Sequence, residues 1–438
     1  MEKDRKIVLA TFGSLGDLFP VVAFGRALKE IGFRPMIASW SDYRQIVEKA
    51  GLDFAPAGTS ISEMYEIWGM TPGHVVEKMI RDPSYIIHKM AMMLIGKHAR
   101  EMADACGGAE LIIAHPLSFP ARVIAEKRGI PWGIMALYPI VMWSAYDPPA
   151  GGVALPMIAR PKSRIAVAYN RAAIGIVHRI LGQQLRHLRE LRQWLGMPKL
   201  SRARLVHQMN DAEFVIGLFS PHFHGPQPDH PPNTSIVGFP YFDSGIVGAH
   251  SGDRELEDFL AAGPPPVVFT LGTLATNIRG NFFEICKSAI KALGMRAILL
   301  VGSEHGAELK GLADEDIFVR EYLSHAKIFP RASIVVHHGG IGTTAEALRA
   351  GKPQLVVPFL GDQRDNAARL ERLGVADSLL PRRYRVPAVV AKLRRLGGDA
   401  ALARKAAELS ERVSGEDGAM AGALKVREFL DARRAQRR

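Results

Sequence analysis

Residues 337–366, HHGGIGTTAEALRAGKPQLVVPFLGDQRDN, combine histidine, glycine, threonine and acidic residues in an order suited to a phosphorylated ligand. An apolar run leads into His338 and Gly340, and Gly342 and Thr343 then open a helix. The free amides and the dipole at a helix start favour negative charge, and glycines let the backbone approach an anion closely. The segment therefore predicts a diphosphate site, although an isolated His-Gly-Gly also fits a tight turn after a buried strand.

Three further polar residues follow His338 at spacings that suit the rest of a sugar nucleotide. Glu346 lies eight residues later on the predicted helix, and the pair Asp362 and Gln363 follows the next apolar strand, Leu355–Val357. Open α/β sheets bind ligands at the carboxyl ends of their strands. We therefore expect Glu346 to bind a ribose, and Asp362 and Gln363 to bind the sugar.

A second strand, turn and helix near the N-terminus carry a single acidic residue. The apolar strand Ile7–Phe12 precedes the turn GSLGDLFP, which contains Ser14, Gly16 and Asp17. The third glycine of the dinucleotide-binding pattern is missing, which disfavours a dinucleotide-dependent dehydrogenase. We expect Ser14 and Gly16 to contact the donor and Asp17 to accept a proton from a substrate hydroxyl.

Two other interpretations of this chemistry remain open. An aspartate before a helix also caps the first backbone amides, and that role is compatible with catalysis. His115 follows another strand end, in the sequence IIAHP, and is a rival base, although a lone histidine there also fits an acceptor pocket or a turn. A carboxylate with a pKa of about 4 can accept a proton late, as the hydroxyl oxygen attacks.

Alternating strands and helices must position these residues, and they divide the chain into two α/β halves. The first half has predicted strands near 7–12, 33–39, 110–114, 131–137 and 213–218, and helices near 20–32, 41–50, 84–105, 118–128 and 164–196. The second half has predicted strands near 267–271, 296–301, 316–320, 333–337 and 354–358, and helical segments from 386 to 436. A loop rich in proline and histidine, Ser220–Pro232, marks the division between the halves.

Composition excludes several classes of protein. The two cysteines among the 438 residues, Cys106 and Cys286, lie far apart, which disfavours a disulfide framework and a cysteine-based metal site and favours the cytoplasm. No secretory signal opens the chain, and its longest charge-free stretch, Ile130–Tyr146, is too short to span a membrane.

The formal net charge of +12 is compatible with nucleic acid, an anionic membrane surface or an anionic small ligand. The basic runs lack the interleaved aromatic residues typical of RNA binding, so nucleic acid is not expected. The basic stretch 160–192 accompanies the apolar stretch 131–157 in the same half, which suggests peripheral contact with the inner face of a membrane. Solvated helix faces are the alternative.

The segment that begins at His337 resembles the donor signature of the UDP-glycosyltransferase family, whose members are nucleotide-sugar glycosyltransferases with the GT-B fold. The signature residues stand at matching spacings: His338, Thr343, Glu346, Asp362 and Gln363. Gly342 stands where plant members have asparagine, and bacterial members share this glycine.

The resemblance implies an α/β, GT-B architecture: two Rossmann-like domains facing each other across a cleft. It assigns residues 1–220 to an acceptor-binding domain, 221–245 to a linker and 246–415 to a donor-binding domain. It also implies that a C-terminal helix, 416–438, packs back onto the N-terminal domain.

Further positions match the pattern of this family. Tyr322 and Leu323 occupy the place of its Trp-x-Pro-Gln, whose aromatic ring stacks on the nucleobase, although a core tyrosine is the alternative. Gly272 and Thr273 match the Gly-Ser/Thr after the first strand of the donor domain, which places Thr273 near the β-phosphate. Asp17 stands where plant and animal members have the histidine base, and bacterial relatives commonly share the aspartate.

The string Asp314-Glu315-Asp316 matches the Asp-x-Asp that holds Mn²⁺ in glycosyltransferases of another fold. It precedes a predicted strand in a polar turn, and a GT-B enzyme stabilises the leaving diphosphate with amides and His338. We therefore expect no metal and no cofactor, with the nucleotide sugar as a co-substrate.

The sequence predicts an inverting hexosyltransferase that uses a UDP- or TDP-linked sugar and a hydroxyl of a hydrophobic acceptor, such as a lipid, a hydroxy-fatty acid or a polyketide-like natural product. Within the family the chain most resembles the bacterial rhamnosyltransferases that make rhamnolipids, and macrolide or sterol glycosyltransferases, on motifs that include GFPYFD and PQLVVP. A sugar-nucleotide epimerase of the same fold and a catalytically silent partner subunit are the alternatives.

Overall fold

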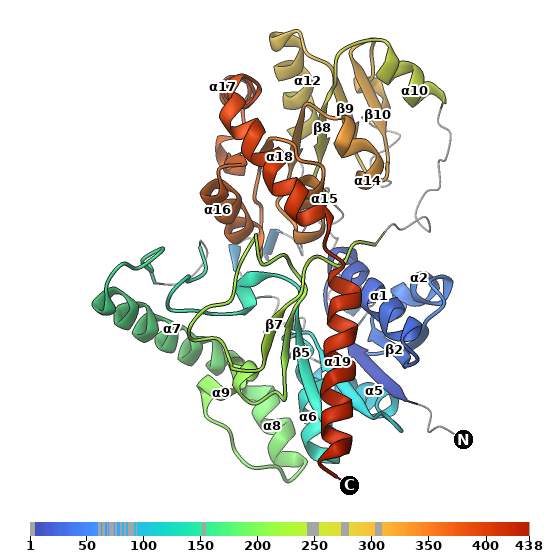
Figure 1. Ribbon diagram of the computed structural model, residues 1–438, viewed down its shortest axis with the longest axis vertical. Helices are drawn as coiled ribbons and strands as arrows, with labels where there is room; N and C mark the ends of the chain where they lie inside the picture. The colour runs from blue at the N-terminus through green and yellow to red at the C-terminus, as the bar shows by residue number, and fades with distance from the viewer. Residues whose placement is uncertain are drawn as a thin grey trace. The chain divides into compact units, whose positions relative to one another are not determined.

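The chain builds two parallel β-sheets, one in each of two structural units (Figure 1). Unit 1 contains Met1–Phe242 and Glu416–Arg438, and unit 2 contains Asp243–Gly415. The structure is a computed structural model that describes residues 5–59, 94–150, 155–242, 254–272, 280–302 and 309–437, with scattered positions between 63 and 92. The predicted pair of α/β domains is confirmed.

Unit 1 has a seven-stranded sheet in the order β3-β2-β1-β4-β5-β6-β7. Its strands are β1 Lys6–Ala10, β2 Arg34–Ser39, β3 Asp53–Pro56, β4 Leu111–Ala114, β5 Trp132–Ala136, β6 Val215–Gly217 and β7 Thr234–Ile236. Its described helices are α1 Leu15–Glu30, α2 Arg44–Lys49, α5 Ile95–Ala105, α6 Phe119–Arg128, α7 Arg164–Gln184, α8 Arg186–Trp194, α9 Arg202–Val206 and α19 Gly418–Ala435.

The register of this sheet brings two distant turns together. Ala10 at the end of β1 pairs with Ala114 at the end of β4, and the backbone N–H of His115 donates to the Ala10 carbonyl at 2.8 Å. Because the strands are parallel, the turns that follow them leave the sheet at the same end, which is formed by the carboxyl ends of the strands. One of these turns carries Asp17 and the other carries His115.

Unit 2 has a six-stranded parallel sheet in the order β10-β9-β8-β11-β12-β13. Its strands are β8 Val267–Thr270, β9 Ala297–Leu300, β10 Ile317–Arg320, β11 Ile334–His337, β12 Gln354–Val356 and β13 Ala376–Ser378. Its described helices are α10 Arg254–Ala261, α12 Phe282–Leu293, α14 His325–Ile328, α15 Ile341–Arg349, α16 Gln363–Leu373, α17 Val386–Gly398 and α18 Ala400–Ser414.

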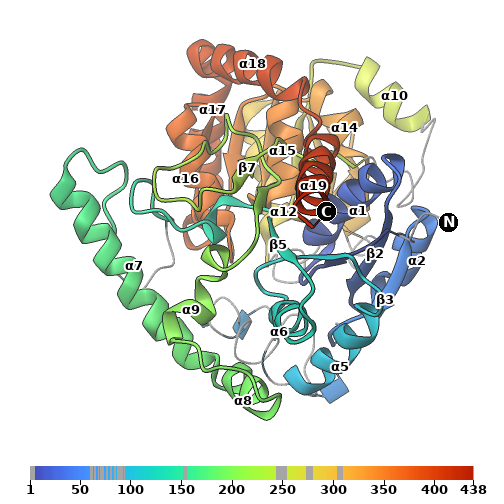
Figure 2. The ribbon, with the colours of Figure 1, turned by 60° about the horizontal axis from the view of Figure 1, so that its bottom comes forward.

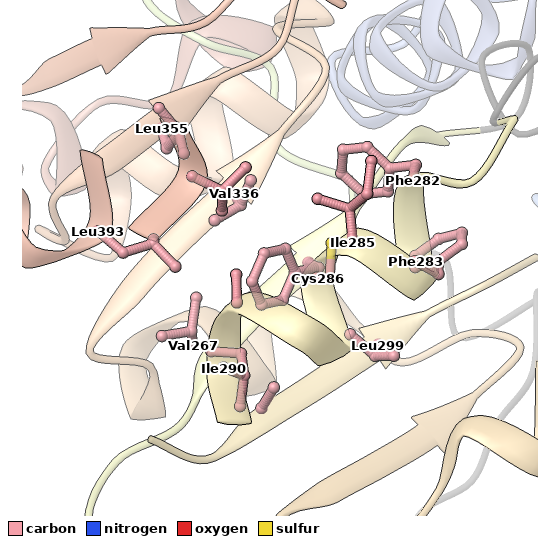
Figure 3. Close-up of a cluster of buried hydrophobic side chains, with 14 of the residues drawn as sticks. Val267, Phe282, Phe283, Ile285, Cys286, Ile290, Leu299, Val336, Leu355 and Leu393 are labelled. Atoms are coloured by element: carbon pink, nitrogen blue, oxygen red, sulfur yellow. The ribbon is translucent and has the colours of Figure 1, made fainter. Parts of the chain in front are cut away.

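Both faces of the unit 2 sheet are buried, which explains why its strands read as continuous apolar runs. Val267 belongs to one core cluster, and its neighbour Val268 belongs to another on the opposite face. Figure 3 shows the first cluster, in which apolar side chains of α12 meet those of the strands and Leu393 of α17. His337 in β11 pairs with Thr270 in β8, so the turns after these two strands adjoin.

The chain returns to unit 1 at Glu416, and α19 packs against α1. The Glu416 carboxylate accepts a hydrogen bond from the Ser220 hydroxyl at 2.6 Å. A Cβ at Gly418 would lie 2.1 Å from the carbonyl oxygen of Gly238, so a glycine is needed where α19 begins. Residues 221–242, expected in the linker, belong to unit 1 and contribute β7.

Every strand expected from the sequence is present, and three further strands occur: β3, β7 and β13. All three lie at sheet edges. The helix expected from residue 20 begins at Leu15, because Ser14 caps it and Pro20 is accommodated inside. The helix expected at 164–196 is two helices that meet at the buried Leu185, and the first part of the helix expected at 84–105 lies largely outside the described residues.

None of the helices in the described parts of the chain has the length and apolar character needed to cross a membrane.

Candidate functional site

Asp17 lies in the first turn of α1, directly after β1. Ser14 is the N-cap residue, and its hydroxyl accepts a hydrogen bond from the Gly16 N–H at 3.2 Å. The Asp17 carboxylate in turn accepts from the Ser14 N–H at 2.7 Å and from the Ser14 hydroxyl at 3.2 Å. This reciprocal capping box fixes the carboxylate against the turn. Ser14 and Gly16 are therefore bonded into the turn that holds Asp17.

The environment of Asp17 makes it a stronger base than an ordinary carboxylate. Burial raises its pKa from 3.8 to about 6, although hydrogen bonds from Ser14 and Tyr138 act in the opposite direction. A Cβ at Gly13 would lie 2.2 Å from Asp17 Oδ2. Only a glycine at position 13 lets the backbone pass so close to this carboxylate. A carboxylate with a pKa near 6 is deprotonated at neutral pH and still accepts a proton readily.

His115 is buried and neutral, and its hydrogen bonds fix which nitrogen carries the proton. Its Nδ1 accepts the Leu117 N–H at 3.2 Å, and burial lowers its pKa to about 3. A neutral imidazole with an accepting Nδ1 must carry its proton on Nε2. Nε2 is buried and has no hydrogen-bond partner among the described residues. This arrangement suits a hydrogen-bond donor to a ligand and does not suit the base considered from the sequence.

Tyr138 connects these two residues and was not predicted from the sequence. Its hydroxyl hydrogen-bonds the Asp17 carboxylate, and its ring meets the His115 ring edge-on with 5.6 Å between centroids. Tyr138 lies two residues after β5, which neighbours β4 in the sheet. The rule that functional residues follow the carboxyl ends of parallel strands could have identified it.

In unit 2, His338 lies in the turn after β11, with its ring packed over two glycines. A Cβ at Gly272 would lie 2.5 Å from the ring, and a Cβ at Gly340 would lie 2.3 Å from Nε2. Burial lowers the pKa of His338 to about 3, and the neighbouring His337 and His325 lower it further. His338 is therefore neutral, and its Nδ1 has no partner among the described residues.

The helix that follows, α15, begins without a side-chain cap. Its N-cap residue is Gly340, whereas α1, α7 and α9 are each capped by a serine hydroxyl. Thr343 is buried in the first turn, and Gly342 is exposed, with no heavy atom within 4 Å of the position a Cβ would take. Uncapped amides beside a neutral histidine are suited to the oxygens of a phosphate.

Glu346 lies one turn further along α15. It is partly exposed and accepts a hydrogen bond from Arg349 at 2.6 Å. The partly exposed Glu346 carboxylate is compatible with binding ribose hydroxyls, which donate to carboxylates.

The start of α16 is tied to the histidine turn by Asn366, a residue that was not predicted from the sequence. Its buried amide donates to the Gly339 carbonyl at 2.9 Å and to the Asp362 carboxylate at 2.6 Å. Asn366 thus fixes Asp362 beside the turn that carries His338. It stands four residues after Asp362, one helical turn on, and that spacing was a usable signal.

The side-chain oxygen of Gln363 is already hydrogen-bonded within the protein. It is 5 % exposed, and its Oε1 accepts the N–H groups of Phe359 at 2.8 Å and Leu360 at 3.0 Å. The side-chain NH₂ group is the part of Gln363 left for a sugar hydroxyl.

Of the two residues expected near the nucleobase, one is partly exposed and the other belongs to the core. Leu323 is buried in the same cluster as Val268 and Phe329, so its side chain supports the fold. Tyr322 is partly exposed, with its ring 6.3 Å from that of His325. Thr273 lies outside the described residues.

The Asp-x-Asp string is engaged in ion pairs. Lys291 contacts Asp314 at 3.1 Å and Asp316 at 2.8 Å, and Lys287 contacts Asp314 at 3.2 Å. No group of histidine, cysteine and acidic side chains suited to a metal ion occurs among the described residues.

Comparison with known proteins assigns both halves of the chain. Residues 7–142 match the glycosyltransferase family 28 N-terminal domain, and residues 288–418 match the C-terminal domain of erythromycin biosynthesis protein CIII-like proteins. The chain is 29 % identical to O-mycaminosyltylonolide 6-deoxyallosyltransferase of Streptomyces fradiae, and the match covers 98 % of each chain. The chain is a glycosyltransferase with the GT-B fold.

This chain is also similar to enzymes of fungi and plants. It is 27 % identical to a sterol 3-beta-glucosyltransferase of Arabidopsis thaliana over 86 % of its length, and it spans 58 % of that enzyme. It is 26 % identical to a sterol 3-beta-glucosyltransferase of Debaryomyces hansenii over 94 % of its length, and it spans 26 % of that enzyme.

Solved structures support the fold of this glycosyltransferase. The kitacinnamycin glycosyltransferase superposes with a TM-score of 0.71 at 20 % identity, covering 97 % of this chain and 99 % of the other. A spinosyn rhamnosyltransferase in complex with thymidine diphosphate superposes with a TM-score of 0.64 at 18 % identity, with the same coverage.

Proposed function

We propose that this glycosyltransferase transfers a hexose, with inversion, from a UDP- or TDP-linked sugar to a hydroxyl of a hydrophobic acceptor. The observation that carries the proposal is Asp17: a carboxylate with a pKa of about 6, held by Ser14 and Tyr138 at the carboxyl edge of the unit 1 sheet. This group accepts the hydroxyl proton as the acceptor oxygen attacks the anomeric carbon and the nucleoside diphosphate leaves.

Unit 2 supplies the groups for the nucleotide. The uncapped amides at the start of α15 and an N–H of His338 donate to the diphosphate oxygens, and Glu346 accepts from the ribose hydroxyls. Asp362 and the NH₂ group of Gln363 bind the sugar, and Tyr322 stacks on the base. These donors stabilise the leaving diphosphate without a metal ion or cofactor, so activity should persist in EDTA.

The relatives support the class of sugar and acceptor. Two are named for transfer of 6-deoxyallosyl and glucosyl groups, to O-mycaminosyltylonolide and to sterols. A structural neighbour holds thymidine diphosphate. We therefore propose a hydroxyl on a lipid, a hydroxy-fatty acid or a polyketide-like compound as the acceptor.

The first experiment measures thermal stabilisation of the wild type and of His338→Ala by UDP, TDP, UDP-glucose and TDP-rhamnose. Stabilisation by one nucleotide family that is lost in His338→Ala supports the donor site and identifies the base. If no nucleotide stabilises the wild type, the donor assignment is wrong.

A second experiment separates transferase from epimerase and from a silent subunit. Asp17→Asn should bind the donor normally and fail to transfer the sugar to an acceptor. Donor incubated alone should yield no new sugar nucleotide, whereas an epimerase would produce one. Retained transfer in Asp17→Asn would show that Asp17 is not the base.

A further inference from the structure

Helix α7 carries a stripe of apolar side chains on its exposed face. Ile165 is 83 % exposed, Tyr169 45 %, Ile176 47 % and Ile180 43 %. At 100° per residue these positions fall within about 60° of one another around the helix. The opposite face is buried against unit 1, so this stripe is additional to the face that packs on the core.

Three arginines lie on one side of this apolar stripe, about 40° to 120° around the helix from its edge. Arg164, Arg171 and Arg179 are exposed, and none forms an ion pair with a described residue. The chain contains no acidic residue between Asp147 and Glu190. The exposed part of α7 is therefore both apolar and positively charged, and the surrounding stretch of sequence supplies no acidic residue.

The helix that bears this face is firmly attached to unit 1. Buried Asn170 donates to the carbonyls of Ala145 and Ile158, both at 2.9 Å, and accepts the Ile158 N–H at 2.9 Å. A Cβ at Gly182 would lie 2.4 Å from the Arg202 carbonyl, so α9 packs closely on α7. Figures 1 and 2 both show α7 on the opposite side of unit 1 from α2. The stripe is thus presented on a fixed support.

We propose that the exposed face of α7 docks on an anionic lipid surface. A helix lies in the plane of a membrane when an apolar face enters the headgroup boundary and neighbouring cations contact anionic lipids. Isoleucines supply the apolar contact, Tyr169 is an amphipathic residue of the interface, and long arginine side chains reach back to the phosphates. The uninterrupted positive charge favours a lipid surface over a partner helix, which would need its own matching acidic row.

The test is co-sedimentation of the full chain with vesicles of phosphatidylcholine, with or without about 30 mol % phosphatidylglycerol. The wild type should bind the anionic vesicles and lose binding in high salt. Arg171→Gln with Arg179→Gln should weaken binding roughly twenty-fivefold, since each cation contributes about a fivefold factor. Ile176→Ser with Ile180→Ser should weaken it at least about tenfold, and leucine at both positions should preserve it.

A matched control removes two exposed arginines from α18, Arg404→Gln with Arg412→Gln, and should bind as the wild type does. Equal binding by all variants would overturn the proposal. So would gel filtration showing that the chain self-associates through the isoleucines and ignores lipid, because the stripe would then be an interface between copies. Since the substituted side chains are exposed, each variant should keep the wild-type thermal unfolding of unit 1, which calorimetry without lipid verifies.

Discussion

The pKa of Asp17 is set by its surroundings. The ordinary carboxylate pKa, assumed from the sequence, would make Asp17 a weak base. Burial raises the pKa to about 6, while the capping hydrogen bonds from Ser14 hold the carboxylate in place. Helix capping and proton acceptance, considered as alternatives from the sequence, are compatible in this geometry.

A base with this pKa predicts the pH dependence of transfer. The kcat/KM should rise with pH, with a midpoint near 6, and level off above it because Asp17 must be deprotonated to accept a proton. The pH profile of Asp17→Asn should lack this limb. Its kcat/KM should be about 10²- to 10⁴-fold lower than that of the wild type. A wild-type profile without a limb between pH 5 and 7 would contradict the assignment.

The same pKa shift predicts that the difference in stability between the wild type and Asp17→Asn depends on pH. Because the pKa of Asp17 is raised from 3.8 to about 6 on folding, the folded state favours the protonated acid, and its stabilising contribution is lost as pH rises through this window. Thermal unfolding should therefore show the wild type losing stability relative to Asp17→Asn between pH 4 and 6. A constant difference across that range would mean that Asp17 is not buried as described.

His115 predicts a different effect, because it is a donor and has no titration near neutrality. His115→Gln and His115→Phe both lose the acceptor for Leu117, but glutamine keeps a side-chain N–H. We expect kcat/KM of the phenylalanine variant to be about tenfold lower than that of the glutamine variant, because only the phenylalanine variant loses the hydrogen bond to the ligand. The pH limb near 6 should remain in both variants, and its disappearance would restore His115 as the base.

Residue types and spacing identified Ser14, Asp17 and His338 as candidates, because each follows an apolar strand in a recognisable turn, and Glu346, because it lies on the helix after one. They did not identify Tyr138 or Asn366. Tyr138 acts through a contact between two turns that are distant in sequence, and Asn366 acts by bonding a carbonyl in another turn. The strand end before Tyr138 and the spacing of Asn366 from Asp362 were usable signals, but the contacts themselves depend on strand order, which local patterns do not contain.

At the scale of elements, glycines determine how the strand ends pack. The His338 ring fits between the turn after β8 and the start of α15 because residues 272 and 340 have no side chains. The backbone of Gly340 has φ −62° and ψ 145°, which alanine also adopts. A substitution there tests the packing of the ring without straining the chain.

Gly340→Ala should therefore displace His338 and weaken the binding of the nucleotide. The thermal shift with UDP or TDP should fall, whereas Gly398→Ala, at a site with no heavy atom within 4 Å of the added Cβ, should keep the wild-type shift. Equal shifts in the two variants would show that the position of His338 does not matter for the nucleotide.

The strands missed from the sequence share one property, which is their place at the sheet edge. β3 and β7 are only partly buried, and β7 and β13 have three residues each. A half-exposed, short strand leaves no apolar run to detect. Central strands such as β1 and β11, buried on both faces, were predicted because burial requires apolar residues there.

At the scale of the molecule, unit 1 is assembled from two separate parts of the chain. Gly422 of α19 packs close to Phe24 of α1, where a Cβ would lie 3.1 Å from the ring, and Ala423, Val426 and Leu430 are buried. Unit 2 is formed by one continuous segment.

A chain that ends at Gly415 should therefore destabilise one unit selectively. Loss of α19 exposes the apolar face of α1, and each large apolar side chain uncovered costs about 1.5–3 kcal/mol. Calorimetry should show a lowered transition for unit 1 and a retained transition for unit 2 that UDP or TDP still raises. Unchanged unfolding of both units would show that α19 is dispensable.

The packing of α19 on α1 also constrains the order of events during synthesis on the ribosome. Unit 2 is complete once residue 415 has left the exit tunnel, whereas unit 1 cannot cover Phe24 until residues 418–435 follow. The N-terminal half, although translated first, is thus finished last. Its α1 surface remains available to chaperones throughout translation of unit 2, a delay of about 10–30 s at usual elongation rates.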